Sequence, residues 1–339
     1  MHRDVNNHIH TTYSFSPYTP AQAVEKAKES GLCVAGIVDH DSISGAGEFL
    51  AEGARLGFPV TVGFEMRVYS AHTKIAGRRT NHPDQTDITY LTFHGVPHTK
   101  IETVDRFLQP IRAARGVRNR AICARLGLDY ERDVLPLSMH EKGGSVTERH
   151  ILFALAKGDY DKLAALKSAF KDYIPAGREE CPDIEKVLAF ATENGIIATY
   201  PYLGDVTKSV TGDKKPQKFE DDYLDELIAI LAEMGFRAIS YMPSRNTMEQ
   251  LTRLRALCDK HGLLQISGED INSPSQPFIC QAMRDPVFAN LYHTTWALIG
   301  HEQAATQNLS EGFLAFEAPL EEKIAHFSKL GRRAHGIAD

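Results

Sequence analysis

Cysteine is scarce in this chain, and its spacing excludes two common uses of the residue. The five cysteines among 339 residues are widely separated, and none of them forms a Cys-x-x-Cys pair. An odd number of scattered thiols does not suit a disulfide-stabilised secreted fold or a zinc ribbon. We therefore expect reduced thiols that pack as small apolar side chains in a cytoplasmic protein.

Long apolar runs and an excess of positive charge are also missing. No stretch approaches the roughly 20 apolar residues of a membrane-spanning helix, and the first residues lack the apolar core of a secretory signal. The formal net charge is −6, which argues against broad binding to nucleic acid or to anionic membranes. The expected partner is therefore a small molecule, and composition does not set the oligomeric state.

Strand-like and helix-like segments alternate over most of the chain. Apolar runs typical of buried strands occur at 5–10, 34–38, 59–64, 88–93, 195–199, 236–242 and 263–267. Helical spacing lies between several of them, at 20–30, 44–56, 219–234 and 247–260. Thr19 and Pro20 suit the start of the first helix, and Gly31 suits its end. About seven βα units favour an α/β fold with a closed or nearly closed parallel barrel.

A helical segment interrupts this alternation. Residues 106–185 are rich in Arg, Leu, Ala and Lys with helical spacing, and we interpret them as an insertion into the barrel. The predicted organisation is a barrel in two parts, 1–105 and 186–302, on either side of this insertion. Packing helices are expected over 303–339.

The sequence His8-Ile9-His10 places two imidazoles two residues apart on a predicted strand. Successive side chains of a strand alternate between its faces, so both imidazoles face the same way and can share a metal ion. Further imidazole and carboxylate groups follow other predicted strands directly, at His40, Glu65, His94 and Asp270. Functional groups of parallel barrels gather at the carboxyl ends of the strands, so we expect all six side chains on one rim. Imidazole and carboxylate ligands together suit Zn²⁺, Mn²⁺ or Fe²⁺.

The order of these motifs resembles the PHP (polymerase and histidinol phosphatase) superfamily. The matching motifs are His-x-His at 8–10, Asp-His-Asp at 39–41, Gly-x-Glu at 63–65, a strand-end histidine at 94 and Gly-x-Asp at 268–270. The resemblance covers about 1–100 and 186–272 and implies a distorted (β/α)7 TIM-like barrel with a cluster of up to three metal ions. It also implies a metal-dependent phosphoesterase whose ligands are His8, His10, His40, Glu65, His94 and Asp270.

Three positions depart from the family pattern and bear on the number of ions. Phe15 stands where the family has an aspartate, while Tyr200 and Asn272 each replace a histidine. A phenyl ring cannot bind a metal and an amide oxygen binds weakly, so the third site should be vacant or weak.

The first site keeps its expected ligands, so we predict one firm divalent transition-metal ion and at most one weaker neighbour. Tyr200 would either ligate the second ion as a phenolate or hydrogen-bond to metal-bound water. This leaves His40 and Tyr200 as the candidate catalytic groups.

Positive groups are expected at the same rim to hold an anionic substrate. Residues 145–148, Ser-Val-Thr-Glu, have the spacing of a capping box, which predicts a helix start followed at once by Arg149 and His150. Backbone N–H groups and an arginine at a helix start can bind phosphate. A solvated first helical turn is the alternative. Two further candidates are Arg245, after a predicted strand, and Lys215, in a polar loop.

Three classes of function fit these features. The leading hypothesis is a metal-dependent hydrolase that cleaves a small phosphorylated metabolite, a nucleotide or a sugar phosphate, by attack of metal-bound hydroxide on phosphorus. A metallohydrolase of a non-phosphate bond is the second, because the missing ligands could have followed a change of substrate. A non-catalytic metabolite-binding barrel is the third, and the complete first-site ligand set argues against it.

Overall fold

The computed structural model describes residues 3–140, 142–169, 174–206 and 217–337. Within these residues, seven strands form one sheet in sequence order. The strands are β1 Val5–Ile9, β2 Val34–His40, β3 Val60–Tyr69, β4 Ile88–His94, β5 Ile197–Pro201, β6 Ala238–Tyr241 and β7 Leu264–Ser267. A parallel bridge between Ile9 and Ile271 connects β1 to the segment that follows β7. The sheet is therefore a nearly closed, distorted barrel, which confirms the predicted fold class.

One strand of the barrel runs against the others. β4 is antiparallel to both β3 and β5, whereas the remaining neighbours are parallel. The connection from β3 to β4 is a loop over residues 70–87 and holds no helix. Our expectation of seven βα units was wrong at this point, because two strands joined without a crossover helix pair antiparallel.

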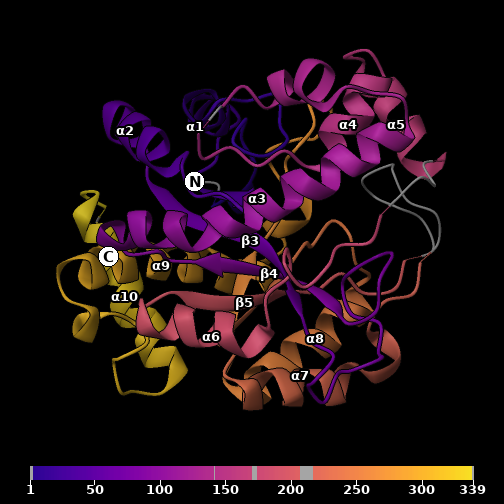
Figure 1. Cartoon of the computed structure of the whole chain (residues 1–339). Coiled ribbons are helices and arrows are strands. Elements are labelled where there is room, and N and C mark those ends of the chain that lie inside the picture. The colour runs from indigo at the N-terminus through magenta and orange to yellow at the C-terminus, as the bar shows by residue number, and fades with distance from the viewer. Residues whose placement is uncertain (1–2, 141, 170–173, 207–216, 338–339) are drawn as a thin grey trace.

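Helices cover the outside of the barrel, and their ends follow from local sequence (Figure 1). The predicted helices are confirmed as α1 Pro20–Glu29, α2 Ala46–Leu56, α7 Leu224–Met234 and α8 Met248–His261. Thr19 caps α1 in a capping box with Gln22, and Gly57 ends α2 with a φ of 59°. These helices bury apolar faces against the strands, as Ala23, Val24 and Ala27 do on α1.

The segment between β4 and β5 is helical, while the bounds 106–185 of the proposed insertion stay a prediction. It contains α3 Ile101–Arg125, α4 Glu148–Leu155, α5 Tyr160–Ala169 and α6 Ile184–Glu193, with a π turn at Tyr130–Val134 and a 3-10 turn at Leu135–Ser138. The helix α3 runs across the molecule, and α4 and α5 form a separate group beside it (Figure 1). Phe15 packs against Phe153 and Tyr160 of this group.

Two long helices complete the fold. α9 Ala289–Gln307 and α10 Leu320–Ala334 pack against each other, and Trp296 of α9 is fully buried. Asn7 of β1 donates to Thr295 at 2.7 Å, which ties α9 to the barrel. α9 continues through residue 302, so no element ends at the proposed boundary between 186–302 and 303–339. That boundary stays a prediction. Short 3-10 turns lie at His98–Lys100, Asp221–Tyr223, Gln281–Arg284, Pro286–Phe288 and Leu309–Glu311.

The helices give no sign of a membrane span. Over the described ranges, none of them combines the length and the apolar character that crossing a bilayer requires.

Candidate metal centre and active site

The imidazoles of His8 and His10 converge at the end of β1. Their Nε2 atoms lie 3.2 Å apart, and both side chains are buried. This agrees with the two-residue repeat of a strand, which sends both side chains to one face. The segment after β7 pairs with the same stretch of chain, since His10 N donates to Ile271 O and Ile271 N donates to His8 O. That pairing places Asp270 beside His10.

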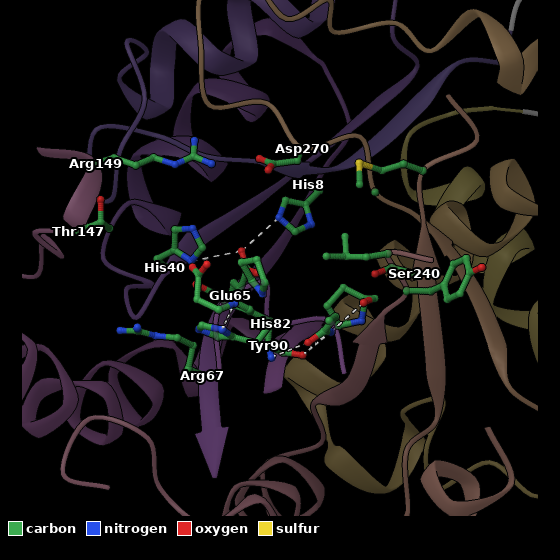
Figure 2. Close-up of a pocket in the computed structure, with 18 of the residues that line it drawn as sticks. His8, His40, Glu65, Arg67, His82, Tyr90, Thr147, Arg149, Ser240 and Asp270 are labelled. Carbon is green, nitrogen blue, oxygen red and sulfur yellow. Dashed lines mark hydrogen bonds and ion pairs between the residues drawn. The ribbon is translucent and has the colours of Figure 1, made fainter. Parts of the chain in front are cut away.

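Glu65 lies at the centre of the cluster. Its Oε2 is 3.3 Å from Nε2 of His8, 3.7 Å from Nε2 of His10 and 3.3 Å from Nδ1 of His40. Asp270 Oδ1 lies 3.3 Å from Nε2 of His10. Figure 2 shows His8, His40 and Glu65 joined at the middle of the cavity, with Asp270 beside them. Five of the six predicted ligands thus form one connected cluster, in which each side chain contacts at least one other.

Burial and charge set the protonation of this cluster. Burial would raise the pKa of Glu65, but the imidazoles of His40, His8 and His10 outweigh burial and lower it to about 2. Burial lowers the pKa of His40 to about 3, although Glu65 acts in the opposite direction. His40 is therefore neutral at pH 7. Nδ1 is the ring nitrogen of His40 that faces Glu65.

A hydrogen-bond relay fixes the tautomer of His10. Ser14 Oγ donates to Oδ1 of Asp39 at 2.6 Å, and the same oxygen lies 3.3 Å from Nδ1 of His10. Asp39 is buried and also accepts from Thr11 N and Thr11 Oγ1. The single hydroxyl hydrogen of Ser14 goes to the carboxylate, so the contact between Ser14 and His10 is a hydrogen bond that Nδ1 of His10 donates. The lone pair of His10 Nε2 then faces Glu65 and Asp270.

His94 lies deeper in the barrel than we expected. It pairs with Gly63, two residues before Glu65, because β4 runs antiparallel to β3. Residues paired across two strands share a face, so His94 faces the same side as Glu65. Burial lowers the pKa of His94 to about 3, and among the described residues its buried Nε2 has no hydrogen-bond partner. The expectation that all six side chains lie on one rim is wrong for His94.

These residues fit a divalent metal ion. Ligand atoms of His8, His10 and Glu65 all lie within 4.8 Å of one another. The lone pair of His10 Nε2 faces two carboxylates, and an electron-rich pocket of this kind is neutralised by a cation. The unpartnered nitrogen of His94 is a further donor near the cluster. Asn272 donates its side-chain amide to Asp270 and so supports that carboxylate.

Tyr200 does not reach this site. Glu65 pairs with Thr92 and Thr92 pairs with Thr199, so these three residues face the interior and Tyr200 faces outward. There Tyr200 packs near Phe236 in the apolar core, and burial raises the pKa of its phenol well above the usual range. The predicted catalytic or metal-binding role of Tyr200 is therefore corrected, because strand alternation puts it on the wrong face.

A cavity of about 500 Å³ opens over the cluster. His8, His40, Glu65 and Asp270 line one part of it, and Arg149 lines another. The guanidinium of Arg149 points across the cavity towards Asp270 (Figure 2). Among the described residues, Arg149 makes no hydrogen bond or ion pair, although it follows Glu148 at the start of α4. The geometry brings Arg149 to the same cavity as the predicted metal ligands, and its role in binding substrate stays a prediction.

The other predicted substrate-binding residues lie elsewhere. The N-cap of α4 is Thr147, two residues after the expected Ser145, and its partner in the capping box is His150. Nδ1 of His150 accepts from Thr147 N at 3.0 Å, so His150 completes the helix start and does not line the cavity. Arg245 donates to Leu203 O and lies over the ring of Phe219.

Arg245 therefore supports the wall of the cavity from outside it. Lys215 lies outside the described residues, so its predicted role stays a prediction.

The residues of the cavity that escaped the sequence analysis include three charged side chains beside the cluster. Arg67 on β3, Arg115 on α3 and Glu148 on α4 all line the cavity. Arg67 lies two residues after Glu65 on the same strand face, and this spacing was a signal that could have found it. The other two come from the insertion, whose contacts with the barrel leave no pattern in the sequence.

Comparison with known proteins now identifies the family. The model of the PHP domain matches residues 6–239, which is more than half of the chain. The chain belongs to the PHP domain family, as its motifs indicated. With the imidazole and carboxylate cluster, this membership defines a hydrolase with a metal-binding site.

Relatives of this chain support the same fold. The 3',5'-nucleoside bisphosphate phosphatase of Chromobacterium violaceum is 20% identical over 280 residues, which cover 80% of this chain and 88% of the relative. A structure from Bifidobacterium adolescentis, provisionally described as a metal-dependent phosphoesterase, has a TM-score of 0.62 at 23% identity and covers 81% of this chain and 88% of its own. An amidohydrolase from Chromobacterium violaceum with bound sulfate has a TM-score of 0.62 at 18% identity, with coverages of 81% and 89%. At these identities the two structures establish the fold alone.

Proposed function

We propose that this chain is a metal-dependent phosphoesterase that removes phosphate from a small phosphorylated metabolite. The observation that carries the proposal is the position of Arg149, whose guanidinium lines the same cavity as Glu65, His8 and Asp270. Among the described residues, no carboxylate lies within ion-pair distance of this guanidinium, and Asp270 acts on it only at longer range, so it is available to an anionic ligand. Guanidinium groups bind phosphate oxygens by charge-assisted, bidentate hydrogen bonds.

The residues divide the chemistry between them. His8, His10, Glu65 and Asp270 would hold a divalent ion, with His94 as a further donor. Such an ion supplies Lewis acidity towards a phosphoryl oxygen and lowers the pKa of water. Arg149 would bind and orient the phosphoryl group from the other side of the cavity. His40, whose Nδ1 faces Glu65, would be a further ligand or a proton acceptor beside the ion.

The wall of the cavity favours a nucleotide over a sugar phosphate. Its apolar and aromatic lining comes mainly from Pro83, Tyr90, Leu152, Tyr202, Leu203 and Met242. A sugar presents hydroxyl groups that need polar partners, whereas the flat apolar face of a base is buried favourably against such a wall. The printed name of the Chromobacterium violaceum relative, a nucleoside bisphosphate phosphatase, is consistent with this choice.

A phosphate-release assay tests the proposal. The chain is purified without added metal, its metal content is measured, and it is then loaded with Mn²⁺ or Zn²⁺. Nucleoside monophosphates, nucleoside bisphosphates and sugar phosphates are supplied in parallel. We expect metal-dependent phosphate release, fastest from a nucleotide. Metal binding with release from none of these esters, but with cleavage of an amide substrate, would favour a hydrolase of a non-phosphate bond instead.

A further inference from the structure

A cluster of buried ion pairs joins the barrel to the helical insertion beside the cavity. It consists of three arginines and three carboxylates: Arg67, Arg115, Arg118, Asp41, Glu148 and Glu180. The charges balance, and all members except Glu148 are almost completely buried. Buried ions are tolerated only when each has a partner, so removal of one member changes the packing of the others.

Glu148 is one of three members of the cluster that line the cavity, with Arg67 and Arg115, and it directly precedes Arg149. Its Oε2 accepts from Nη2 of Arg115 at 2.7 Å, and its Oε1 contacts both Nη1 of Arg67, at 3.4 Å, and Nη2 of Arg118. Burial would raise the pKa of Glu148, but the three arginines outweigh burial and hold it well below the usual range. Glu148 is therefore ionised and held from three sides.

Two of its partners lead directly to the metal cluster. Arg67 lies two residues after Glu65 on β3 and shares its strand face. Arg115 also donates to Asp41, which directly follows His40 at the end of β2. The carboxylate of Glu148 therefore connects the start of α4 to both strands that supply Glu65 and His40. Arg149 is the next residue of the same helical turn, so its backbone position depends on these contacts.

We propose that Glu148 is a positioning residue that sets Arg149 over the metal cluster. This inference rests on the proposed function, because it assumes that Arg149 binds the phosphate. A carboxylate that only stabilises the fold would affect ligand binding in the same way whether Arg149 is present or absent. A carboxylate that acts through Arg149 has no effect on phosphate binding once the guanidinium is gone.

A double-mutant cycle separates these two roles. Glu148→Gln, Arg149→Ala and the double variant are loaded with Mn²⁺, and the Kd of inorganic phosphate is measured by calorimetry. Glu148→Gln should weaken phosphate binding by about tenfold when Arg149 is present and leave it nearly unchanged in the Arg149→Ala background. The number of metal ions per chain should stay the same in all four proteins, since Glu148 binds none of the predicted ligands.

A second variant covers the case in which Glu148→Gln does not fold. Glu148→Asp keeps the negative charge, so the arginines stay neutralised, but its shorter side chain draws back the helix start. It should weaken phosphate binding by roughly threefold, again only when Arg149 is present. The matched control is Glu131→Gln, which removes an exposed ion pair with Arg120 on the insertion and should leave phosphate binding unchanged.

The outcomes distinguish this inference from the proposed function. Equal losses of phosphate binding in the presence and absence of Arg149 overturn the positioning role, even if the wild-type chain hydrolyses phosphoesters. A wild-type chain that holds metal but neither hydrolyses phosphoesters nor binds phosphate overturns the proposed function and the positioning role together. Hydrolysis measured on the variants adds a second reading, in which Glu148→Gln raises KM more than it lowers kcat.

Discussion

The hydroxyl oxygen of Ser14 lies 3.3 Å from Nδ1 of His10, and the hydroxyl group donates a hydrogen bond to Asp39. Ser14 is fully buried, and its hydroxyl group contacts Asp39 and His10. It therefore acts on the metal cluster only through the tautomer and orientation of one imidazole. Such supporting hydrogen bonds are as much a part of a metal site as its ligands.

Replacing Ser14 by alanine should weaken metal binding without unfolding the chain. Nδ1 of His10 loses its acceptor in Ser14→Ala, so the imidazole no longer prefers the tautomer that presents Nε2 to the cluster. We expect a metal affinity lower by roughly 10- to 100-fold, measured by competition with a chelating dye. Ser16→Ala is the matched control, because that hydroxyl only accepts from Tyr18 N. Equal affinities for the two variants would refute the relay.

Replacing His10 by alanine should abolish metal binding and remove the stability that the ion provides. An ion that binds only the native state raises the unfolding temperature by mass action. Elemental analysis of His10→Ala should find almost no transition metal, and added Mn²⁺ should no longer raise its Tm. His72→Ala is the control, since His72 is an exposed residue that pairs with Asp183. Normal metal content in His10→Ala would show that β1 does not supply the site.

Replacing Arg149 by alanine should separate phosphate recognition from metal binding. The loss of charge-assisted hydrogen bonds should lower kcat/KM for a phosphoester by roughly 10- to 100-fold, while the metal content stays the same. Arg149→Lys should recover part of the activity, because an ammonium keeps the charge but not the planar fork. Arg106→Ala, an exposed change on α3, serves as the control. Unchanged kinetics for Arg149→Ala would make it a solvated residue of the first helical turn.

Glu220 should make the stability of the chain fall as the pH rises. Burial is the main cause that raises the pKa of Glu220 to about 7, against the backbone N–H groups of Leu203 and Gly204 that it accepts from. A carboxyl group whose pKa is higher in the folded state than in the unfolded state stabilises the fold at a pH below its unfolded-state pKa. This stabilisation is lost as the pH rises from there to the folded-state pKa of about 7. The loss is on the order of 3 kcal/mol.

The variant Glu220→Gln cannot ionise and keeps an oxygen for the two backbone donors. Its free energy of unfolding in urea should therefore change less than that of the wild-type chain between pH 5 and pH 8, and should exceed it at pH 8. Glu233→Gln, at an exposed ion pair with Lys74, should follow the wild-type chain. Parallel pH dependences for Glu220→Gln and the wild-type chain would contradict the assignment. The change matters for the site because Leu203 lines the cavity.

Local rules account for the parts of the site that the sequence could predict. The spacing of His8 and His10 reports the face of one strand, and the order of the motifs reports the family. The first depends on neighbours in sequence, and the second on short motifs whose order along the chain can be read without the fold. The failure at Tyr200 has the opposite origin, because its face depends on the pairing of β4 with β5. The sequence at the end of a strand does not indicate on which face of the sheet the last side chain lies.

The sequence by itself determined the alternation of strands and helices, the helical insertion, and the imidazoles and carboxylates that can bind a metal, since each depends on periodicity or residue chemistry. Only the tertiary structure decided the direction of β4, and with it the depth of His94 beside Glu65. It also decided that His150 completes the capping box at the start of α4, while Arg149 faces the cavity. The contacts of Glu148 join residues from strands and helices far apart in the chain, and side chains that meet only through folding leave no local pattern to find.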